Sequence, residues 1–263
     1  MPERFTEERL RAPALSMSDV AAQLRHFVLL TYAVDPERVR PYVDESFDLD
    51  CYLDAAGRRK VWVSAVPFED QDFHFHGLPW WRFRFGQTNY RTYVIERRSG
   101  RRCVWFFGTV LDSWTRLIPR HFWKLPWHSG RIQFDTDFDE TSGRYRRYRM
   151  NCQGEWAAAE LELEDLGEEI SSIDGFDDLE SSLVILTHPL TGFYRRRDGL
   201  LGSYSIWHPR LAMNRCRLVS ARFELLHRLG LVNFEEQKQV HSLLIQRECL
   251  FHIHLPPRRL ASP

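Results

Sequence analysis

A chain of 263 residues is long enough to bury one sizeable core, and an aromatic share of 14% favours a sheet-rich domain with a ring-lined interior. Lysine and arginine together number 36, as do aspartate and glutamate, so no net field draws the chain to nucleic acid or to an anionic membrane. Five scattered cysteines without CxxC spacing argue against a disulfide framework or a thiolate zinc site and favour a reducing compartment. Because no signal sequence or long apolar run is evident, we expect a cytoplasmic protein without a membrane partner.

The N-terminal part of the chain predicts a helix, a strand and a second helix. Residues 16–25 are typical of a helix capped by a serine, which ends an N-terminal helical extension over residues 1–25. The apolar, β-branched residues 27–34 predict a strand. Asp35 and Pro36 then predict the start of a short helix, as its cap and its first residue.

The rest of the chain predicts mainly strands, separated by short turns that favour antiparallel pairing. The predicted strands cover residues 60–68, 90–97, 103–111, 130–137, 144–152, 155–164, 202–208, 216–225 and 246–255. Helices are predicted over residues 113–122 and 181–186. The acidic segment 165–180 indicates a solvated loop, and residues 256–263 a frayed tail. We therefore expect one α+β domain over residues 1–263.

Lysine is rare in this chain, and one lysine has an unusual setting. Arginine outnumbers lysine 33 to 3, and Lys60 and Lys238 lie in polar stretches that indicate surface charges. Lys124 lies instead in the aromatic run 122–127, where desolvation would disfavour its charged form and favour an amine able to attack a carbonyl. The alternative is a lysine whose stem packs on a tryptophan such as Trp127 while its head stays in water.

One predicted strand carries three polar groups on a single face. Asn89, Arg91 and Tyr93 alternate along the strand, so an amide, a guanidinium and a phenol point to the same side. If that side faces a cavity, the guanidinium of Arg91 suits a carboxylate or a phosphate. An internal ion pair is the alternative, because buried arginines are normally paired.

Two His-x-His pairs have the spacing of metal ligands on a strand. They are formed by His74 with His76 and by His252 with His254. Neither pair has an obvious third ligand, so we expect surface histidines and no metal.

Two single histidines have settings closer to the candidate lysine or to aromatic residues. His128 follows Lys124 by four residues and could act as an acid or base near neutral pH. His208, between Trp207 and Pro209, is a pocket group or a hydrogen-bonded core histidine.

A strand over residues 144–149 interleaves arginines with tyrosines, a pattern that can contact nucleic acid. Acidic residues at 135, 137, 139 and 140 lie beside it in sequence, so a charge-paired, solvent-facing strand is the better interpretation. We expect no nucleic-acid partner. The chain also lacks a phosphate-binding P-loop, a Rossmann fingerprint and a nucleophile elbow.

Five short motifs occur in a familiar order, at residues 89–94, 104–107, 122–127, 193–194 and 207–209. Together they resemble the uncharacterised YqjF-like bacterial family of the acetoacetate decarboxylase-like superfamily. The resemblance extends from about residue 27 to about residue 256. It implies a single domain of curved antiparallel sheets, barrel-like, that enclose a central cavity with a few helices outside.

The resemblance also implies a chemistry for Lys124. Acetoacetate decarboxylase uses a lysine Schiff base as an electron sink. The superfamily motif is Pro-Lys-Lys followed by an apolar residue, whereas residues 123–125 are Trp-Lys-Leu, so Lys124 matches either the nucleophilic or the activating lysine. The decarboxylases carry an acidic residue where this chain has Arg91, which implies a different ligand or reaction.

We therefore predict a lyase-type enzyme, such as a decarboxylase, aldolase or dehydratase, that acts without a cofactor on a keto acid or a related carboxylated carbonyl compound. The catalytic candidates are Lys124 and His128. The substrate-binding candidates are Asn89, Arg91, Tyr93, Trp105, Phe107, Trp127 and His208. The alternative is a non-catalytic sensor or carrier whose aromatic cavity holds an apolar or carboxylated metabolite. The sequence leaves the substrate and the oligomeric state open, a homo-oligomer included.

Overall fold

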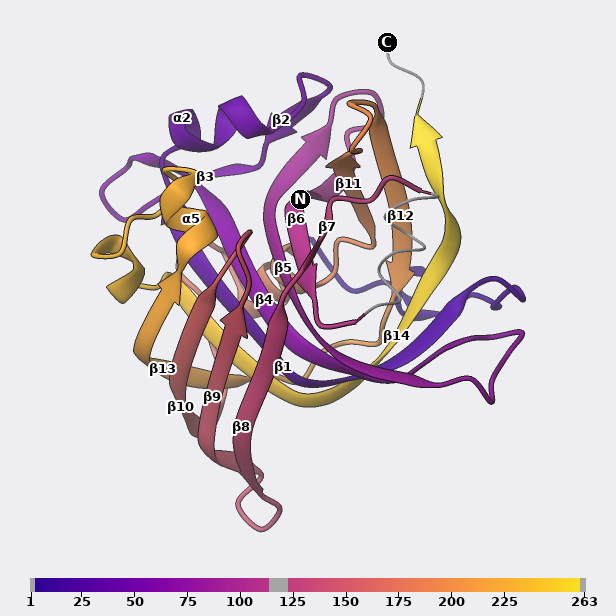
Figure 1. The fold of residues 1–263 in the computed structure, drawn as a ribbon. Helices are drawn as coiled ribbons and strands as arrows, with labels where there is room; N and C mark the ends of the chain where they lie inside the picture. Colours follow the sequence, from indigo (N-terminus) through magenta and orange to yellow (C-terminus); the bar gives the residue numbers. More distant parts are fainter. Residues whose placement is uncertain (1–2, 114–122, 261–263) are drawn as a thin grey trace.

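The computed structural model describes residues 3–113 and 123–260, apart from the side chain of Leu260. Fourteen strands in these residues form one continuous sheet, and seven of them close into a barrel in the order β1–β4–β5–β6–β11–β12–β14, because β14 also pairs with β1 (Figure 1). Neighbours in this ring are antiparallel except β6 and β11, which are parallel. The barrel strands are β1 (Val20–Val34), β4 (Arg59–Phe75), β5 (Phe83–Glu96), β6 (Arg102–Leu111), β11 (Thr191–Arg195), β12 (Leu201–Trp207) and β14 (Ser242–Leu260).

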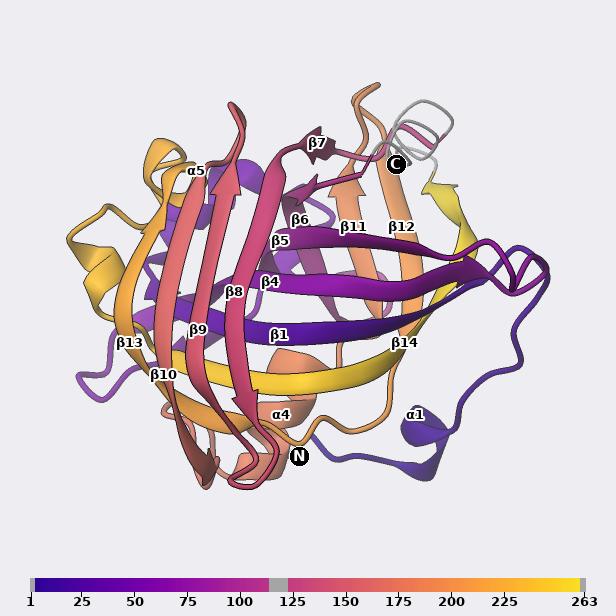
Figure 2. The same ribbon diagram turned by 60° about the horizontal axis from the view of Figure 1, so that its bottom comes forward.

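A second layer of strands extends from β14 and covers one side of the barrel. Its order from β14 is β13, β10, β9 and β8. Figure 2 shows β8, β9 and β10 crossing in front of β1, β4 and β14 at a steep angle. The strands of this layer are β8 (Arg131–Asp139), β9 (Arg144–Gln153), β10 (Ala159–Glu169) and β13 (Asn214–Phe223).

The described helices are few and short, and the longest is α4 (Leu179–Thr187). The carboxylate of Asp178 caps α4 by accepting a hydrogen bond from the backbone N–H of Ser181. In Figure 2, α4 lies at the lower end of the barrel and β7 at the upper end. The remaining elements are α1 (Glu7–Leu10), α2 (Pro36–Val39), α5 (Glu224–Arg228), η1 (Arg40–Tyr42), η3 (Glu236–Lys238), β2 (Phe47–Leu49), β3 (Cys51–Leu53) and β7 (Trp127–Ser129). No helix in the described residues combines the length and the apolarity needed to span a bilayer.

The barrel strands bury side chains on both of their faces. On the outer face, Val28 of β1 and Tyr90 of β5 belong to the same cluster as Met150 of β9, and we call it the inter-layer cluster. On the opposite face, Leu29 of β1 and Tyr93 of β5 belong to a second cluster, which we call the interior cluster. Nearby residues of one strand therefore enter different clusters, as the alternation of side chains along a strand requires.

The interior cluster reaches from one end of the barrel to the other. It includes Leu186 of α4 at one end and Leu125, two residues before β7, at the other (Figure 2). The expected architecture is confirmed: curved, mainly antiparallel strands form a barrel with a few helices packed around it.

Some local predictions were wrong. The helix expected over residues 16–25 gives way at Val20 to β1, and Val20, Ala22 and Leu24 are buried in alternation between β4 and β14. Tertiary pairing here overrides a local helical preference. The tail expected over 256–263 is also wrong up to Leu260, because β14 continues there and pairs with β12.

Other local predictions are partly right or fall outside the structure. The expected loop 165–180 begins within β10, which ends at Glu169. The helix expected over 113–122 falls almost wholly outside the described residues. The short helix expected after Asp35 does form, as α2. The Asp35 carboxylate does not cap it, and instead accepts a hydrogen bond from Lys60 Nζ at 2.6 Å.

Candidate functional site

Arg91 lies in the middle of β5, with only 7% of its surface exposed. Its Nη2 donates a hydrogen bond to the backbone oxygen of Leu186 at 3.0 Å, in the last turn of α4. The carbonyl end of a helix carries partial negative charge, which favours a cation there. Within residues 3–113 and 123–260, however, Nε of Arg91 has no partner and no carboxylate pairs with the guanidinium. The barrel therefore contains a buried positive charge with unused donor capacity.

Tyr93 holds the same carbonyl from the next inward-facing position of β5. Its hydroxyl donates to the backbone oxygen of Leu186 at 2.9 Å and lies 3.1 Å from the hydroxyl of Ser64. Ser64 is in turn 2.8 Å from the hydroxyl of Thr31. The Arg91 guanidinium carbon lies 5.6 Å from the Tyr93 ring centre. Arg91 and Tyr93 therefore share one face, as the alternation predicts.

Asn89 continues this face toward the other end of the barrel. Its side-chain oxygen accepts hydrogen bonds from the hydroxyl of Thr109 at 2.7 Å and from Nε2 of Gln87 at 3.0 Å. Thr109 is also the register partner of Trp127 in β7. The predicted row of polar side chains on β5 therefore exists and leads from α4 toward the segment that contains Lys124.

Lys124 lies at the β7 end of the barrel in an uncommon backbone conformation. The φ angle of Lys124 is 54°, and the residue is half-buried. Its backbone oxygen accepts a hydrogen bond from the N–H of Arg197 at 2.9 Å. The next residue, Leu125, is buried in the interior cluster, and Trp127 packs partly buried against that cluster. The lysine is thus anchored beside the barrel interior by its backbone and its neighbours.

His128 faces the opposite way from Trp127. Its ring stacks on Trp156 with centres 3.7 Å apart, and Trp156 packs against the inter-layer cluster. His128 also pairs in register with Val110, another member of that cluster. Because successive residues of a strand point to opposite faces, the structure does not bring His128 to the same face as Trp127.

The aromatic residues of β6 that were predicted to line the interior, Trp105 and Phe107, face the other layer of strands instead. Trp105 is buried in the inter-layer cluster, and Phe107 packs against that cluster from its edge. Phe106, between them, belongs to the interior cluster and stacks on Tyr204 with ring centres 5.5 Å apart. Residues 103–107 of β6 are all apolar, so no polar alternation indicates which of them face inward.

His208 is completely buried beside the carbonyl that Arg91 holds. Its ring nitrogens lie 2.9 Å from the backbone oxygen of Thr187 and 2.8 Å from that of Pro209. Burial, reinforced by the positive charges of His188 and Arg91, lowers the pKa of His208 to about 4. The ring is therefore neutral at neutral pH. This geometry matches the core-histidine interpretation.

Two interior residues escaped the sequence analysis. Tyr204 in β12 stacks on Phe106 of the interior cluster, and burial raises its pKa while the positive charge of Arg91 opposes this rise. Asp70 is 2% exposed, and it continues the interior face of β4 two residues beyond Phe68. Every second residue of a strand faces the same side, so Asp70 lies on the same face as Ser64. The sequence analysis missed Asp70 because the predicted strand ended at residue 68. Tyr204 has no comparable local signal.

In the two His-x-His pairs, His74, His252 and His254 lie on strands, whereas His76 follows the end of β4. Nδ1 of His74 lies 2.5 Å from the backbone oxygen of Asp72, and Nδ1 of His254 lies 3.3 Å from the carboxylate of Asp19. The part of the chain that the structure describes contains no group of three or more side chains placed to hold a metal ion.

A family model described as an uncharacterized conserved protein, DUF2071, matches residues 21–247. The chain belongs to the DUF2071 family. A comparison with curated proteins gave no match.

Solved structures similar to this DUF2071 chain include acetoacetate decarboxylases and an enzyme of enduracididine biosynthesis. An acetoacetate decarboxylase-like enzyme from Sphingomonas wittichii RW1 has 10% identity and a TM-score of 0.61, with 95% of each chain covered. An acetoacetate decarboxylase from Legionella pneumophila has 14% identity and a TM-score of 0.57, covering 97% of this chain and 94% of that one. The enduracididine biosynthesis enzyme MppR complexed with pyruvate has 12% identity and a TM-score of 0.58, covering 99% and 98%. The expected superfamily resemblance is thus confirmed at the level of the fold.

Proposed function

We propose that this DUF2071 chain is a lyase-type enzyme that binds a keto acid, or a related carboxylated carbonyl compound, inside the barrel. The observation that carries the proposal is the buried guanidinium of Arg91, which has no carboxylate partner in the described residues. Leaving a buried cation unpaired costs several kcal/mol in general, and a bound carboxylate would offset that cost. Arg91 is therefore the proposed anchor for the substrate carboxylate.

Lys124 is the proposed amine. Its neutral amine would attack the substrate carbonyl carbon, form a carbon–nitrogen bond and, after loss of water, give a protonated Schiff base that accepts electrons from the bond to be broken. The half-buried position of Lys124 beside Leu125 and Trp127 supports this role, because rings and aliphatic groups exclude water. Asn89 and Tyr93 would orient the substrate along β5.

Borohydride trapping tests the covalent step. Pyruvate is the first probe, because MppR, a structural neighbour, was solved with pyruvate, and acetoacetate is the second. We expect an adduct on wild type by intact mass, none on Lys124→Ala, and an unchanged adduct on Lys238→Ala, whose lysine is exposed and paired with Glu235. No adduct on wild type, or an equal adduct on Lys124→Ala, ends the Schiff-base proposal.

The second candidate is a non-catalytic sensor or carrier that uses the same interior. Arg91 supports it equally well, since an anion anchor needs no reactive amine. Calorimetric titration with pyruvate separates the two: binding that Arg91→Gln weakens, without any trapped adduct, favours the carrier. Binding that is indifferent to Arg91→Gln contradicts both candidates.

A further inference from the structure

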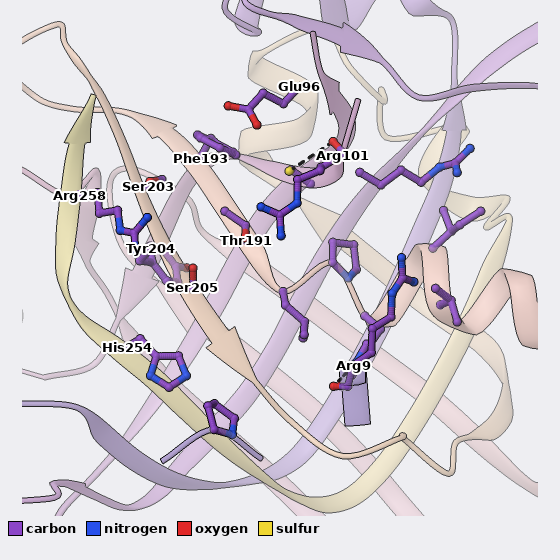
Figure 3. Close-up of a pocket in the computed structure, with 18 of the residues that line it drawn as sticks. Arg9, Glu96, Arg101, Thr191, Phe193, Ser203, Tyr204, Ser205, His254 and Arg258 are labelled. Carbon is purple, nitrogen blue, oxygen red and sulfur yellow. Dashed lines mark hydrogen bonds between the residues drawn. The ribbon is translucent and has the colours of Figure 1, made fainter. Parts of the chain in front are cut away.

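A cavity of about 1140 Å³ opens on the outer wall of the barrel (Figure 3). It lies over β11, β12 and the end of β14, and its wall is completed by N-terminal residues and by the C-terminal end of α4. None of the residues predicted for the interior site lines it. We call this cavity the outer groove.

Strand register gathers hydroxyl groups on the floor of the outer groove. Thr191 of β11 pairs with Ser205 of β12, which pairs with His254 of β14, and Ser203 pairs with Arg258. Paired residues point to the same side of a sheet, so these side chains share one patch. Within residues 3–113 and 123–260, none of the three hydroxyls has a hydrogen-bond partner.

Positive charge surrounds this hydroxyl patch. Four arginines and two glutamates line the outer groove, an excess of two positive charges. One glutamate, Glu3, is already bound by Arg9 and Arg102 at 2.9 Å each. Arg101 and Arg258 pair with no carboxylate in the described part of the chain, and Figure 3 shows them on different sides of the labelled serines.

A buried ring nitrogen without a partner lines the same groove. His188 lines the outer groove with only 4% of its surface exposed, and its Nδ1 has no partner among the described residues. Its Nε2 lies 3.3 Å from the backbone oxygen of Arg9, which can only accept, so Nε2 carries the proton and Nδ1 of the neutral ring is an acceptor that a ligand hydroxyl can satisfy. A buried polar atom without a partner is uncommon in a folded protein, and a bound ligand is one way to satisfy it.

We propose that the outer groove binds a phosphorylated small molecule, with its phosphoryl group over the hydroxyls of Thr191, Ser203 and Ser205 and between the guanidinium groups of Arg101 and Arg258. Hydroxyls and guanidiniums are hydrogen-bond donors to anionic oxygens, and guanidiniums match phosphate geometry. The volume exceeds what a phosphate ion fills, so it leaves room for an organic body. Of the residues named for the interior site, Tyr204 also lines the outer groove. Phosphate binding in the groove does not rest on the proposed enzyme activity.

Calorimetric titration at low salt with inorganic phosphate and with glycerol 3-phosphate tests this proposal. We expect Arg258→Gln and Arg101→Gln each to weaken binding by about tenfold or more, because each removes a charged donor. Arg259→Gln and Arg98→Gln are matched controls: each is an exposed neighbour that does not line the groove, and each should change Kd by less than about twofold.

Three results would overturn the proposal. They are no saturable binding of either probe to wild type, binding no tighter than that of chloride or sulfate, and equal losses in the control variants. Arg91→Gln should bind glycerol 3-phosphate as wild type does, so that failure at the outer groove and failure of the interior site are told apart.

Discussion

Asp70 differs from the other buried aspartates in its hydrogen-bond partners. Asp19 and Asp165 accept hydrogen bonds from backbone N–H groups, and Asp50 accepts one from Arg102. Oδ2 of Asp70 has no partner in the described residues, and burial raises its pKa well above the ordinary value. The folded protein therefore holds this carboxyl in its neutral form over a wider pH range than the unfolded chain does.

This raised pKa predicts a specific pH dependence for Asp70→Asn. A carboxyl with a raised folded pKa contributes stability that is fully present below its unfolded value of about 3.9 and is lost as the pH rises toward the folded value. Asparagine does not ionise and has no such loss. The free energy of unfolding of Asp70→Asn minus that of wild type should therefore increase as the pH rises from about 5 to about 8, by up to about 1.4 kcal/mol per pH unit. Urea denaturation at several pH values measures it.

Asp19→Asn is the control with the opposite sign. Burial alone would raise the pKa of Asp19, but hydrogen bonds from the backbone of Leu255 and Ser16 outweigh it and lower the pKa to about 2. Its stabilising contribution is present above about 3.9 and is lost as the pH falls toward 2. The variant should be less stable than wild type at neutral pH and converge with it in acid. Parallel pH profiles for Asp70→Asn and wild type would contradict the account of Asp70.

At the scale of elements, most strands could be predicted from the sequence, but their inward faces could not. The β5 face with Arg91 and Tyr93 was predictable because its polar residues alternate. Trp105 in β6 was misplaced because residues 103–107 are apolar on both faces of the strand, so polar and apolar residues do not alternate there. The strand β11 went unnoticed, since its five residues pair in parallel with a distant strand and leave no local pattern.

Gly192 of β11 leaves room for the ring of Phe106 in β6, which stacks on Tyr204 of β12. A Cβ at Gly192 would lie 2.3 Å from Cε2 of Phe106, whose ring stacks on Tyr204. We expect Gly192→Ala to displace Phe106 and to lower the free energy of unfolding by about 1–3 kcal/mol, the usual cost of overpacking. Chemical denaturation measures the loss. In the Phe106→Leu background, where the ring edge is absent, the same substitution should cost clearly less; an equal cost in both backgrounds would show that the ring contact is not the cause.

At the scale of the whole molecule, the last turn of α4 joins the two proposed sites. The backbone oxygen of Leu186 holds Arg91 in the barrel, that of Thr187 meets His208, and His188 lines the outer groove. The rings of His188 and His208 lie 4.7 Å apart. An ionised histidine at this junction would place a second positive charge next to Arg91, so the fold favours neutral rings here.

Buried histidines therefore predict that acid weakens the whole fold before most carboxylates titrate. Burial lowers the pKa of His26, His188 and His241, and that of His208 to about 4. A base with a lowered folded pKa contributes stability that is present above its unfolded value of about 6.5 and is lost as the pH falls toward the folded value. The free energy of unfolding should thus fall between about pH 6.5 and about pH 4.

His208→Gln isolates the largest of these contributions. Its amide can still donate a hydrogen bond to Thr187 but cannot take up a proton, so the variant should lose stability less steeply than wild type over this pH range. His76→Gln, at an exposed histidine, is the matched control and should keep the wild-type slope. Urea denaturation at half-unit pH steps gives the slopes directly. If the free energy of unfolding of His208→Gln and of wild type falls equally steeply with pH, His208 is not a source of acid sensitivity. The inference that its ring is neutral in the folded protein would then be wrong.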